Sequence, residues 1–442
     1  MQKLLTDSFW TLFSRGMATA SGLVVSVLIA RSLGPENLGI YVFIVLIVST
    51  VGHLANPGIY AAANYYLSSH RLPRGNVFTL TVCLTLPGAL IGAVVSVFSL
   101  LVGPLNGSAS AANRGLLFGV AIAALFTVIG ISFHGITIGI GRIKIASRGL
   151  AMTSVLHGSV VAGLWLSDTL TLATCTLAYC SFQIIKAIVY MILTLPVWSD
   201  PLRIDRREIK PFLRYSLAVY SGRVLTFLSR RIDSYLVLII AGQAALGYYS
   251  VAANLAGQIG LIPMAVGLSM MPNIGSLTAE ASAHTVLKTS QIIFVVMLTL
   301  GLFIGVAGVA FIPVLYGEVF MVSIIPLLLM IPGIVAIGVY LIVEPYFQAR
   351  GLPQIPVKIS FVGAMSNGVL CIILIPPYGI VGASMAYTIS FLIQTLTTCI
   401  AFSKQSSLPL YSLLNIRNGL SNGLDITRNM IHSARVNTVV DA

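Results

Sequence analysis

The sequence predicts an all-α integral membrane protein with about twelve transmembrane helices in two parallel repeats. The composition is the first indication, because 57% of the 442 residues are hydrophobic, only 8% are charged and the mean hydropathy is +0.97. Soluble domains carry about 25% charged residues. The second indication is a series of apolar runs near the roughly 20 residues that a spanning helix needs. The third is an internal duplication of the sequence.

Apolar runs that end at charged or Gly/Pro-rich turns define the predicted spans. The first run continues to about residue 30 without a small-residue cleavage site, so we interpret it as a retained span and not as a signal peptide. The twelve predicted spans are residues 8–31, 38–57, 76–103, 114–139, 149–167, 170–195, 214–241, 246–272, 289–315, 320–345, 355–376 and 379–402.

The most charged connection, residues 200–214, separates two halves with six predicted spans each. We therefore predict an N-terminal six-helix bundle over residues 1–205 and a C-terminal six-helix bundle over residues 206–405. The remaining residues, 406–442, are predicted to form a polar cytoplasmic tail, which is either frayed or a weak interfacial helix, and we favour the frayed tail.

Lys and Arg are distributed unevenly between the two sides of the predicted membrane protein. Connections on the side of the N-terminus hold eighteen of the 25, whereas those on the opposite side hold only Arg31 and Arg114. Since cytoplasmic loops are rich in Lys and Arg, both termini are predicted to be cytoplasmic. This bias accounts for most of the net charge of +13, so we expect no nucleic-acid partner.

Motifs of enzymatic chemistry are absent from the sequence. It contains no phosphate-binding GxxxxGK[ST], no HExxH and no nucleophile elbow. The cysteines all fall within apolar segments without metal-ligand spacing, and we interpret them as buried hydrophobic residues. They are Cys83, Cys175, Cys180, Cys371 and Cys399. We therefore predict no catalytic residue, no metal site and no cofactor, and a protein that is not an enzyme.

The duplication is clearest just beyond the first and seventh predicted spans. Residues 34–41, GPENLGIY, match residues 242–249, GQAALGYY, at an offset of 208. Extending the match backwards without a gap places Arg15 on Arg223. Two charged residues inside predicted spans are therefore related by the duplication.

A second match has an offset of 210 and follows the fourth span of each half. It places Gly141 on Gly351 and His134 on Glu344. With six spans per half, equivalent helices run in the same direction, so the repeats are parallel and a substrate site is expected at their interface.

Several motifs resemble the polysaccharide-biosynthesis branch of the MOP superfamily, which contains Wzx-type flippases and shares its fold with the drug-exporting MATE transporters. The motifs are SLGPENLGIY, GQAALGYYSVAANLAG, LYGEVF, QARGLP and PPYGIVGASMAYTIS, and the resemblance covers about residues 1–405. It implies a V-shaped pair of six-helix bundles in the bacterial inner membrane. The implied activity is alternating-access transfer of undecaprenyl-diphosphate-linked oligosaccharides to the outer leaflet, for O-antigen, exopolysaccharide or capsule synthesis. Polymerases and glycosyltransferases of the same pathway are implied partners, besides the lipid bilayer.

Residues 214–242 are predicted to form one spanning helix of 29 residues, about 43 Å long. An ionisable side chain in a spanning helix costs roughly 2.5–3.5 kcal/mol and therefore marks a function by default. On one continuous helix, Arg223, Arg230 and Asp233 would share a face. Arg231 would lie about 100° around the helix from Arg230.

These cations are the predicted substrate ligands. Arg15 and Arg223 would approach a cavity from the two repeats, and guanidinium groups suit a diphosphate because they donate two parallel hydrogen bonds and stay charged. Arg230, Arg231 and Lys186 are further candidates. The alternative is that the long side chains snorkel to the cytoplasmic interface.

The remaining charged groups inside spans have two interpretations. Asp233, Glu344 and His134 either couple transport to an ion or serve structural roles, and Asp233 could pair with Arg230 inside the membrane. His53 is a lone histidine in an apolar segment, so we interpret it as a satisfied polar group.

Two other functions remain open from the sequence. A cation-coupled MATE-type exporter of small molecules would have the same fold, but a cavity for organic cations should carry net negative charge. The predicted spans contain five basic residues but only two acidic ones, Asp233 and Glu344, and this excess of positive charge favours an anionic substrate. A membrane glycosyltransferase or polymerase would need large outer loops, and the outer connections are short.

Overall fold

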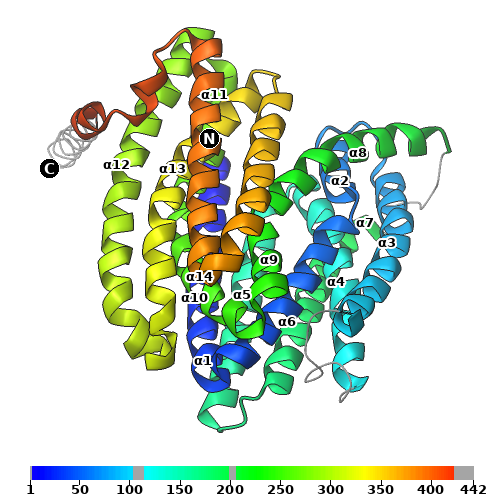
Figure 1. The fold of residues 1–442 in the computed structure, drawn as a ribbon. Helices are drawn as coiled ribbons and strands as arrows, with labels where there is room; N and C mark the ends of the chain where they lie inside the picture. The colour runs from blue at the N-terminus through cyan, green and yellow to red at the C-terminus, as the bar shows by residue number, and fades with distance from the viewer. Residues whose placement is uncertain (1, 103–113, 199–205, 423–442) are drawn as a thin grey trace, which may run out of the picture. The chain divides into compact units, whose positions relative to one another are not determined.

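The structure is a computed structural model that describes residues 2–102, 114–198 and 206–422 (Figure 1). Every regular element in these ranges is helical, which confirms the predicted all-α class. The chain divides into two compact units, which are described separately. The first holds Met1–Val251 and Pro313–Phe320, and the second holds Ala252–Ile312 and Met321–Ala442.

The first unit is built around α4, which packs against α2, α3 and α6, while α5 lies along α1 (Figure 1). Its helices are α1 (Gln2–Leu54), α2 (Ile59–Ser68), α3 (Arg74–Val102), α4 (Arg114–Gly139), α5 (Ile143–Leu166), α6 (Leu172–Leu193), α7 (Leu195–Trp198), α8 (Arg206–Ser229), α9 (Ile232–Ala241) and the first part of α10 (Gln243–Ile259). The unit therefore contains the first predicted span of the second half of the sequence. The prediction of two bundles that divide after residue 205 stays a prediction.

The second unit is built around α13, most of which is buried against α11, α12 and α14. Its elements are α11 (Leu261–Ser276), α12 (Ala279–Phe311), α13 (Ile324–Ala349), α14 (Gln354–Ser406) and the short helix η3 (Leu410–Leu414), and two further short helices, η1 (Ile312–Tyr316) and η2 (Glu318–Ser323), connect α12 to α13. As far as residue 422 the tail is helical in part and packs on the second unit, as the helical alternative allowed. Leu413 is buried there, and Gln291 of α12 donates a hydrogen bond to the Ser412 carbonyl at 2.7 Å.

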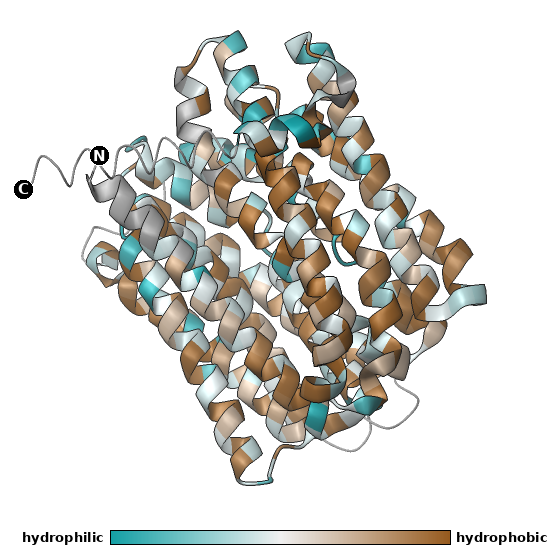
Figure 2. Cartoon of the chain, turned by 90° about the vertical axis from the view of Figure 1, so that its left-hand side faces the viewer, coloured by the Kyte–Doolittle hydropathy of each residue, from teal (hydrophilic) through white to brown (hydrophobic). Residues whose placement is uncertain are grey.

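Nine described helical segments are long and apolar enough to cross a membrane. Two of them, Phe13–Leu54 and Gln354–Ser406, each contain a glycine with non-helical dihedral angles, Gly34 or Gly379, and each accounts for two predicted spans. Helices α8 and α9 together account for one more. Exposed faces such as those of α3 and α12 carry large apolar side chains, and Figure 2 shows hydrophobic residues along much of the long helices. Exposed apolar areas of this extent require a lipid surrounding.

The backbone repeats where the sequence repeats. Gly34 interrupts α1 with φ 71° and ψ 176°, and Gly242 separates α9 from α10 with φ 91° and ψ −177°. Both conformations lie in the region that only glycine adopts without strain. The sequence match at an offset of 208 thus marks the same helix break in each repeat.

The two repeats contact each other through a reciprocal pair of glycines in the first unit. A Cβ added to Gly39 would collide with the backbone carbonyl of Gln243, and one added to Gly247 would collide with that of Pro35. Gly39 and Gly247 are equivalent in the duplication, and so are Pro35 and Gln243. The two contacts are therefore related by an approximate two-fold axis. Both are possible because glycine has no side chain and lets the backbones approach closely.

Two predicted spans are interrupted helices. The predicted helix over residues 214–242 is wrong, because α8 ends at Ser229 and α9 begins at Ile232 after two turn residues. Arg223 and Asp233 therefore do not share one continuous helical face. The second predicted span, residues 38–57, ends at Leu54, and the chain then turns into α2.

Candidate functional site

The site forms where α8 packs on the break between α1 and α2. Ser216 of α8 donates a hydrogen bond to the Pro57 carbonyl, and Tyr220 donates one to the Leu54 carbonyl at 2.7 Å. Two turns later, the Phe227 ring stacks on His53 with centroids 4.8 Å apart. Successive turns of α8 therefore follow the interrupted segment and place Arg223 beside it.

Local sequence explains the break. Pro57 cannot donate a helical hydrogen bond, and Gly58 has φ 74°, where an added Cβ would meet the Ser216 carbonyl. Buried Asn56 fixes the segment: its Nδ2 donates to Ser132 Oγ at 2.6 Å, and its Oδ1 accepts from the Tyr60 amide at 3.2 Å. The start of α2 is thereby anchored to α4.

Aromatic rings connect Arg223 to the interior of the unit. The Arg223 guanidinium carbon lies 4.9 Å from the centroid of the Tyr60 ring. The Tyr60 ring in turn stacks on His134 at 5.7 Å, and His134 packs against Tyr190 at 4.7 Å. A cation over an aromatic face is stabilised by the ring quadrupole, so this column holds one arginine without a carboxylate partner.

Three of the predicted cations influence His134 electrostatically. Lys186, Arg15 and Arg223 all lie within electrostatic range of its imidazole. Lys186 itself is half-buried on α6, where its Nζ donates to Gln183 Oε1 at 2.5 Å and lies 5.0 Å from the Phe182 ring.

His53 is a second histidine that lies in the electrostatic field of several basic residues. It lies within electrostatic range of Arg223, Arg231 and Lys186, and its Nδ1 forms a hydrogen bond of 2.8 Å with the Ser49 carbonyl. Its ring is exposed, not enclosed in the core. The interpretation of His53 as a merely satisfied polar group is therefore incomplete, because it also borders the cationic region.

A small pocket opens within this arrangement. Its lining residues are Gly52, His53, Asn56, Gly58, Tyr60, Ile131, Tyr220, Arg223 and Val224. The pocket thus combines one guanidinium with a histidine, an amide and two phenols. Asn56 and Tyr220 already donate within the chain, so the group here that can bind an anion through charge-assisted hydrogen bonds is the Arg223 guanidinium.

The charged residues at the break between α8 and α9 are arranged differently from the prediction. The buried carboxylate of Asp233 accepts hydrogen bonds from Tyr249 Oη and, at 2.8 Å, from the Ser234 amide, and Arg231 is the cation in its electrostatic range. Among the interactions described for Asp233, Arg231 takes the place that the sequence left open for Arg230. Arg230 is exposed, and no interaction described for residues 206–251 brings it to His53 or His134.

The other predicted acid, Glu344, lies in the second unit. Its Oε1 accepts a hydrogen bond from Gln348 Nε2 at 3.0 Å, one helical turn away on α13. In the described ranges no three His, Cys, Asp or Glu side chains are grouped so that they could hold a metal ion.

Several site residues were not predicted from the sequence, namely Asn56, Tyr60 and Tyr220. The motif Asn56-Pro57-Gly58 was a usable signal, because Gly- or Pro-interrupted spans mark substrate sites in transporters with internal repeats. Tyr60 and Tyr220 carry no such signal. Their role follows from the packing of α8 on α2, two helices that are far apart in the sequence.

Comparisons with solved structures show that the chain shares its fold with several membrane transporters. The lipid II flippase MurJ in an inward closed conformation matches with a TM-score of 0.65 and 16% identity, covering 97% of this chain and 99% of MurJ. An outward-facing MATE multidrug resistance transporter matches with a TM-score of 0.64 and 15% identity, covering 92% and 95%. A MOP transporter from Pyrococcus furiosus, whose binding pocket is described as reversed in polarity, matches with a TM-score of 0.63 and 14% identity, covering 93% and 96%.

The sequence profile of the polysaccharide biosynthesis protein family matches residues 4–278, which is more than half of the chain. The chain belongs to this family, as the sequence motifs indicated. None of the curated proteins compared with it matches.

Proposed function

We propose that this protein is a flippase that moves an oligosaccharide, linked through a diphosphate to a polyprenyl lipid, from the cytoplasmic to the outer leaflet by alternating access. The observation that carries the proposal is the stacking of Arg223 on the Tyr60–His134 column, with Arg15 and Lys186 within electrostatic range of His134 in the same unit. Family membership and the transporter fold support it. The substrate class that fits best is undecaprenyl diphosphate carrying an oligosaccharide unit for O-antigen, exopolysaccharide or capsule synthesis.

The charge balance of the site favours a diphosphate over a neutral substrate. Arg223 stands beside tyrosines, a histidine and an asparagine, whereas the buried carboxylate of Asp233 accepts hydrogen bonds from Tyr249 and Ser234. A substrate with two negative charges is also driven outward by an inside-negative potential. The gain is roughly 2.3 kcal/mol per charge per 100 mV, or about 4–5 kcal/mol for two.

The same proposal covers location and partners. We place the protein in the bacterial inner membrane with both termini cytoplasmic, where lipid-linked sugars are assembled. Glycosyltransferases would supply the substrate and a polymerase would consume it. The uneven distribution of Lys and Arg supports this orientation.

A small-molecule exporter is the second candidate, because MATE transporters match the fold about as well as MurJ does. An organic cation would have to enter a region that already lies within electrostatic range of Arg15, Lys186 and Arg223. Their mutual repulsion would increase on binding, so we favour the anionic lipid. Uptake of an organic cation by proteoliposomes with no transfer of lipid-linked sugar would support the exporter instead.

Transfer of a fluorescent lipid-linked oligosaccharide by the purified protein in liposomes tests the proposal. We expect Arg223→Ala and Arg15→Ala each to reduce the transfer rate about 10- to 150-fold, since a hydrogen bond to a charged group contributes about 1.5–3 kcal/mol. Arg230→Ala is the matched control and should transfer at nearly the original rate. Normal transfer by the Arg15→Ala, Arg223→Ala double variant would refute a role of these cations in binding.

A further inference from the structure

The motif LYGEVF, residues 315–320, lies in the connection between α12 and α13 and takes no part in the candidate site. Residues 313–320, which we call the strap, belong to the first unit, although the residues before and after them belong to the second. The strap contains most of the π-helix η1 and the first half of the 3-10 helix η2. Turns of π-helix are rare and occur frequently at functional sites.

Two aromatic side chains anchor the strap in the first unit. Tyr316 and Phe320 each retain only 2% exposure, and their rings meet edge to face with centroids 6.2 Å apart. Phe320 also contacts the ring of Tyr248 in α10, with centroids 5.8 Å apart. Rings in this arrangement attract each other beyond the effect of the apolar area that they bury. Burial of the two rings is therefore the main attachment of the strap.

The polar contacts of the strap with α1 are long. The Ser26 hydroxyl lies 3.4 Å from that of Tyr316, and Arg31 Nη1 donates a hydrogen bond of 3.5 Å to the Val314 carbonyl. Both distances are at the weak end of hydrogen-bond geometry. The side chains of Val314 and Val319 are 66% and 59% exposed. The strap thus lies on the surface of the first unit and inserts only its two rings.

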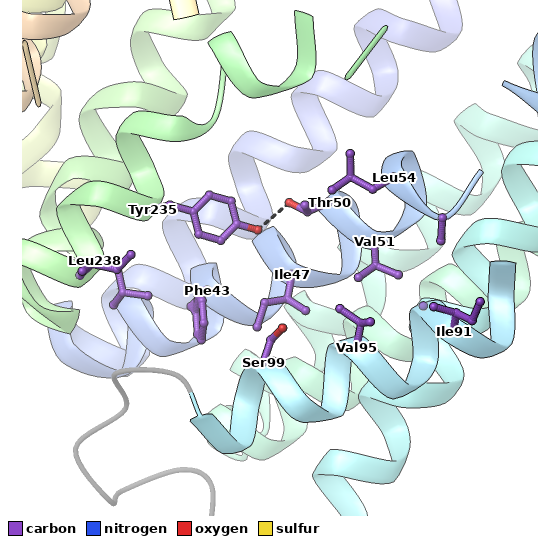
Figure 3. A pocket seen from close by; sticks show the side chains of 13 residues that line it. Phe43, Ile47, Thr50, Val51, Leu54, Ile91, Val95, Ser99, Tyr235 and Leu238 are labelled. Carbon is purple, nitrogen blue, oxygen red and sulfur yellow. Dashed lines mark hydrogen bonds between the residues drawn. The ribbon is translucent and has the colours of Figure 1, made fainter. Parts of the chain in front are cut away.

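The helices under the strap also hold each other without it. Thr50 Oγ1 of α1 and Tyr235 Oη of α9 are 2.6 Å apart and form the hydrogen bond drawn in Figure 3. Gly39 of α1 and Gly247 of α10 bring those two helices into backbone contact. Departure of the strap would therefore leave the packing of α1, α9 and α10 in place.

The strap and its contact on α1 are both predicted to lie on the outer side of the membrane. Arg31 is in the connection between the first two predicted spans and Glu318 in that between the ninth and tenth, and both connections lie opposite the termini. In alternating access, a transporter opens on one side of the membrane at a time. A segment that is continuous with the second unit and anchored in the first would restrain opening on the outer side.

We infer that the strap is a latch, which keeps the outer side closed and leaves its seat before the substrate reaches the outer leaflet. The inference rests on the proposed function, because it requires alternating access. Each cycle withdraws Tyr316 and Phe320 from the first unit and seats them again. Gly317 lies between the two anchors with φ 101°, and an added Cβ there would meet no heavy atom within 4 Å. The backbone is therefore free to rearrange at this residue.

Reversible crosslinking of the strap to α1 tests the latch. Arg31→Cys and Val314→Cys place thiols at two exposed residues of the contact, in the purified full chain in liposomes with exposed Cys83 replaced by serine. We expect a bis-methanethiosulfonate crosslink to slow transfer of lipid-linked oligosaccharide at least about tenfold, because opening of the latch then limits the cycle. Reduction of the crosslink should restore transfer in the same sample, which excludes misfolding as the cause.

A matched pair controls for the reagent. Ser167→Cys and Thr169→Cys lie in the connection between α5 and α6, on the same predicted side, and the hydroxyls that they replace are 2.8 Å apart. The same crosslink there should leave transfer unchanged. Undiminished transfer by the crosslinked Arg31→Cys, Val314→Cys protein would overturn the latch, since the strap would then be a fixed tether.

Thiol labelling tests the latch without a substrate. A cysteine at Ser26 lies beside Tyr316 and should react with a soluble maleimide mainly when the strap has left its seat. We expect Phe320→Ala, which removes one anchor, to speed labelling of Ser26→Cys at least about fivefold, because the open state becomes more populated. Val319→Ala is the matched control, because it shortens an exposed side chain of the same segment. Equal labelling rates in these two variants would overturn the inference.

The two measurements separate this inference from the proposed function. If no variant transfers lipid-linked sugar but Phe320→Ala speeds labelling of Ser26→Cys, the latch stands and the proposed substrate falls. If the crosslinked strap permits normal transfer while Arg223→Ala abolishes it, the flippase stands and the latch falls.

Discussion

Alanine at Gly39 or Gly247 tests the reciprocal contact between the repeats. An added Cβ at Gly39 would lie 2.7 Å from the carbonyl carbon of Gln243, and one at Gly247 would lie 2.9 Å from that of Pro35. Ordinary contact begins at 3.4 Å, so the backbones would have to separate by about 0.7 Å and 0.5 Å, and by more at the carbonyl oxygens. Overpacking of this kind costs about 1–3 kcal/mol for each substitution.

The geometry also predicts how the two substitutions combine. Both contacts join the same two segments, so separating the segments for one methyl group also makes room for the other. We therefore expect the double variant Gly39→Ala, Gly247→Ala to cost nearly as much as one single variant and clearly less than their sum. The measurement is the free energy of unfolding in mixed micelles, determined for both single variants and the double variant.

Glycines elsewhere in the same helices provide the controls. Gly22 in α1 and Gly257 in α10 have no heavy atom of the described chain within 4 Å of an added Cβ. Alanine there should be neutral or stabilising by up to about 1 kcal/mol, since alanine is the better helix former. Fully additive costs at Gly39 and Gly247, or costs no larger than those of the controls, would refute the close reciprocal contact.

Two further substitutions test the framework of the site. Asp233→Ala should lower the free energy of unfolding by about 1–3 kcal/mol, because the hydroxyl of Tyr249 loses its buried acceptor, and Asp233→Asn should recover part of the loss in the same measurement. Asn56→Ala should cost a similar amount, because the Tyr60 amide loses its acceptor and Ser132, which keeps Thr85, loses its donor, and it should also weaken binding of inorganic diphosphate. Unchanged stability of either alanine variant would contradict the burial of these groups.

Composition and periodicity were sufficient to predict the fold, but helix interruptions escaped them. The apolar runs located each span because a bilayer imposes a minimum length on every segment, but not its ends: α12 begins at Ala279, ten residues before the predicted start. Nothing in the run from Arg214 to Gly242 predicted the turn at Arg230, since the hydrophobicity of a segment does not report its dihedral angles. The break at Asn56-Pro57-Gly58 did have a sequence signal, which was masked by the surrounding apolar residues.

The charged residues of the candidate site could be predicted from the sequence, but the aromatic residues around them could not. Arg15, Lys186 and Arg223 were identifiable because charge is rare in spans, and the structure places all three within range of His134. The rings that surround them could not be identified, because a tyrosine in an apolar run carries no comparable cost. Tyr60 is distinguished only by the packing of α8, which places Arg223 over its ring.

The internal duplication therefore explains the positions of the helices and their breaks better than it explains the residues of the candidate site. The arginine pair and the helix breaks at Gly34 and Gly242 repeat, but the groups around the arginines do not. At the same offset, His53 corresponds to Leu261 and Tyr60 to Leu268. The second repeat thus lacks the rings with which the first surrounds its cations. If both repeats contributed equivalent side chains to the site, we would expect it to bind a symmetric ligand. A site whose rings come from the first repeat alone suits an asymmetric ligand, such as a molecule with a charged end and a hydrocarbon end.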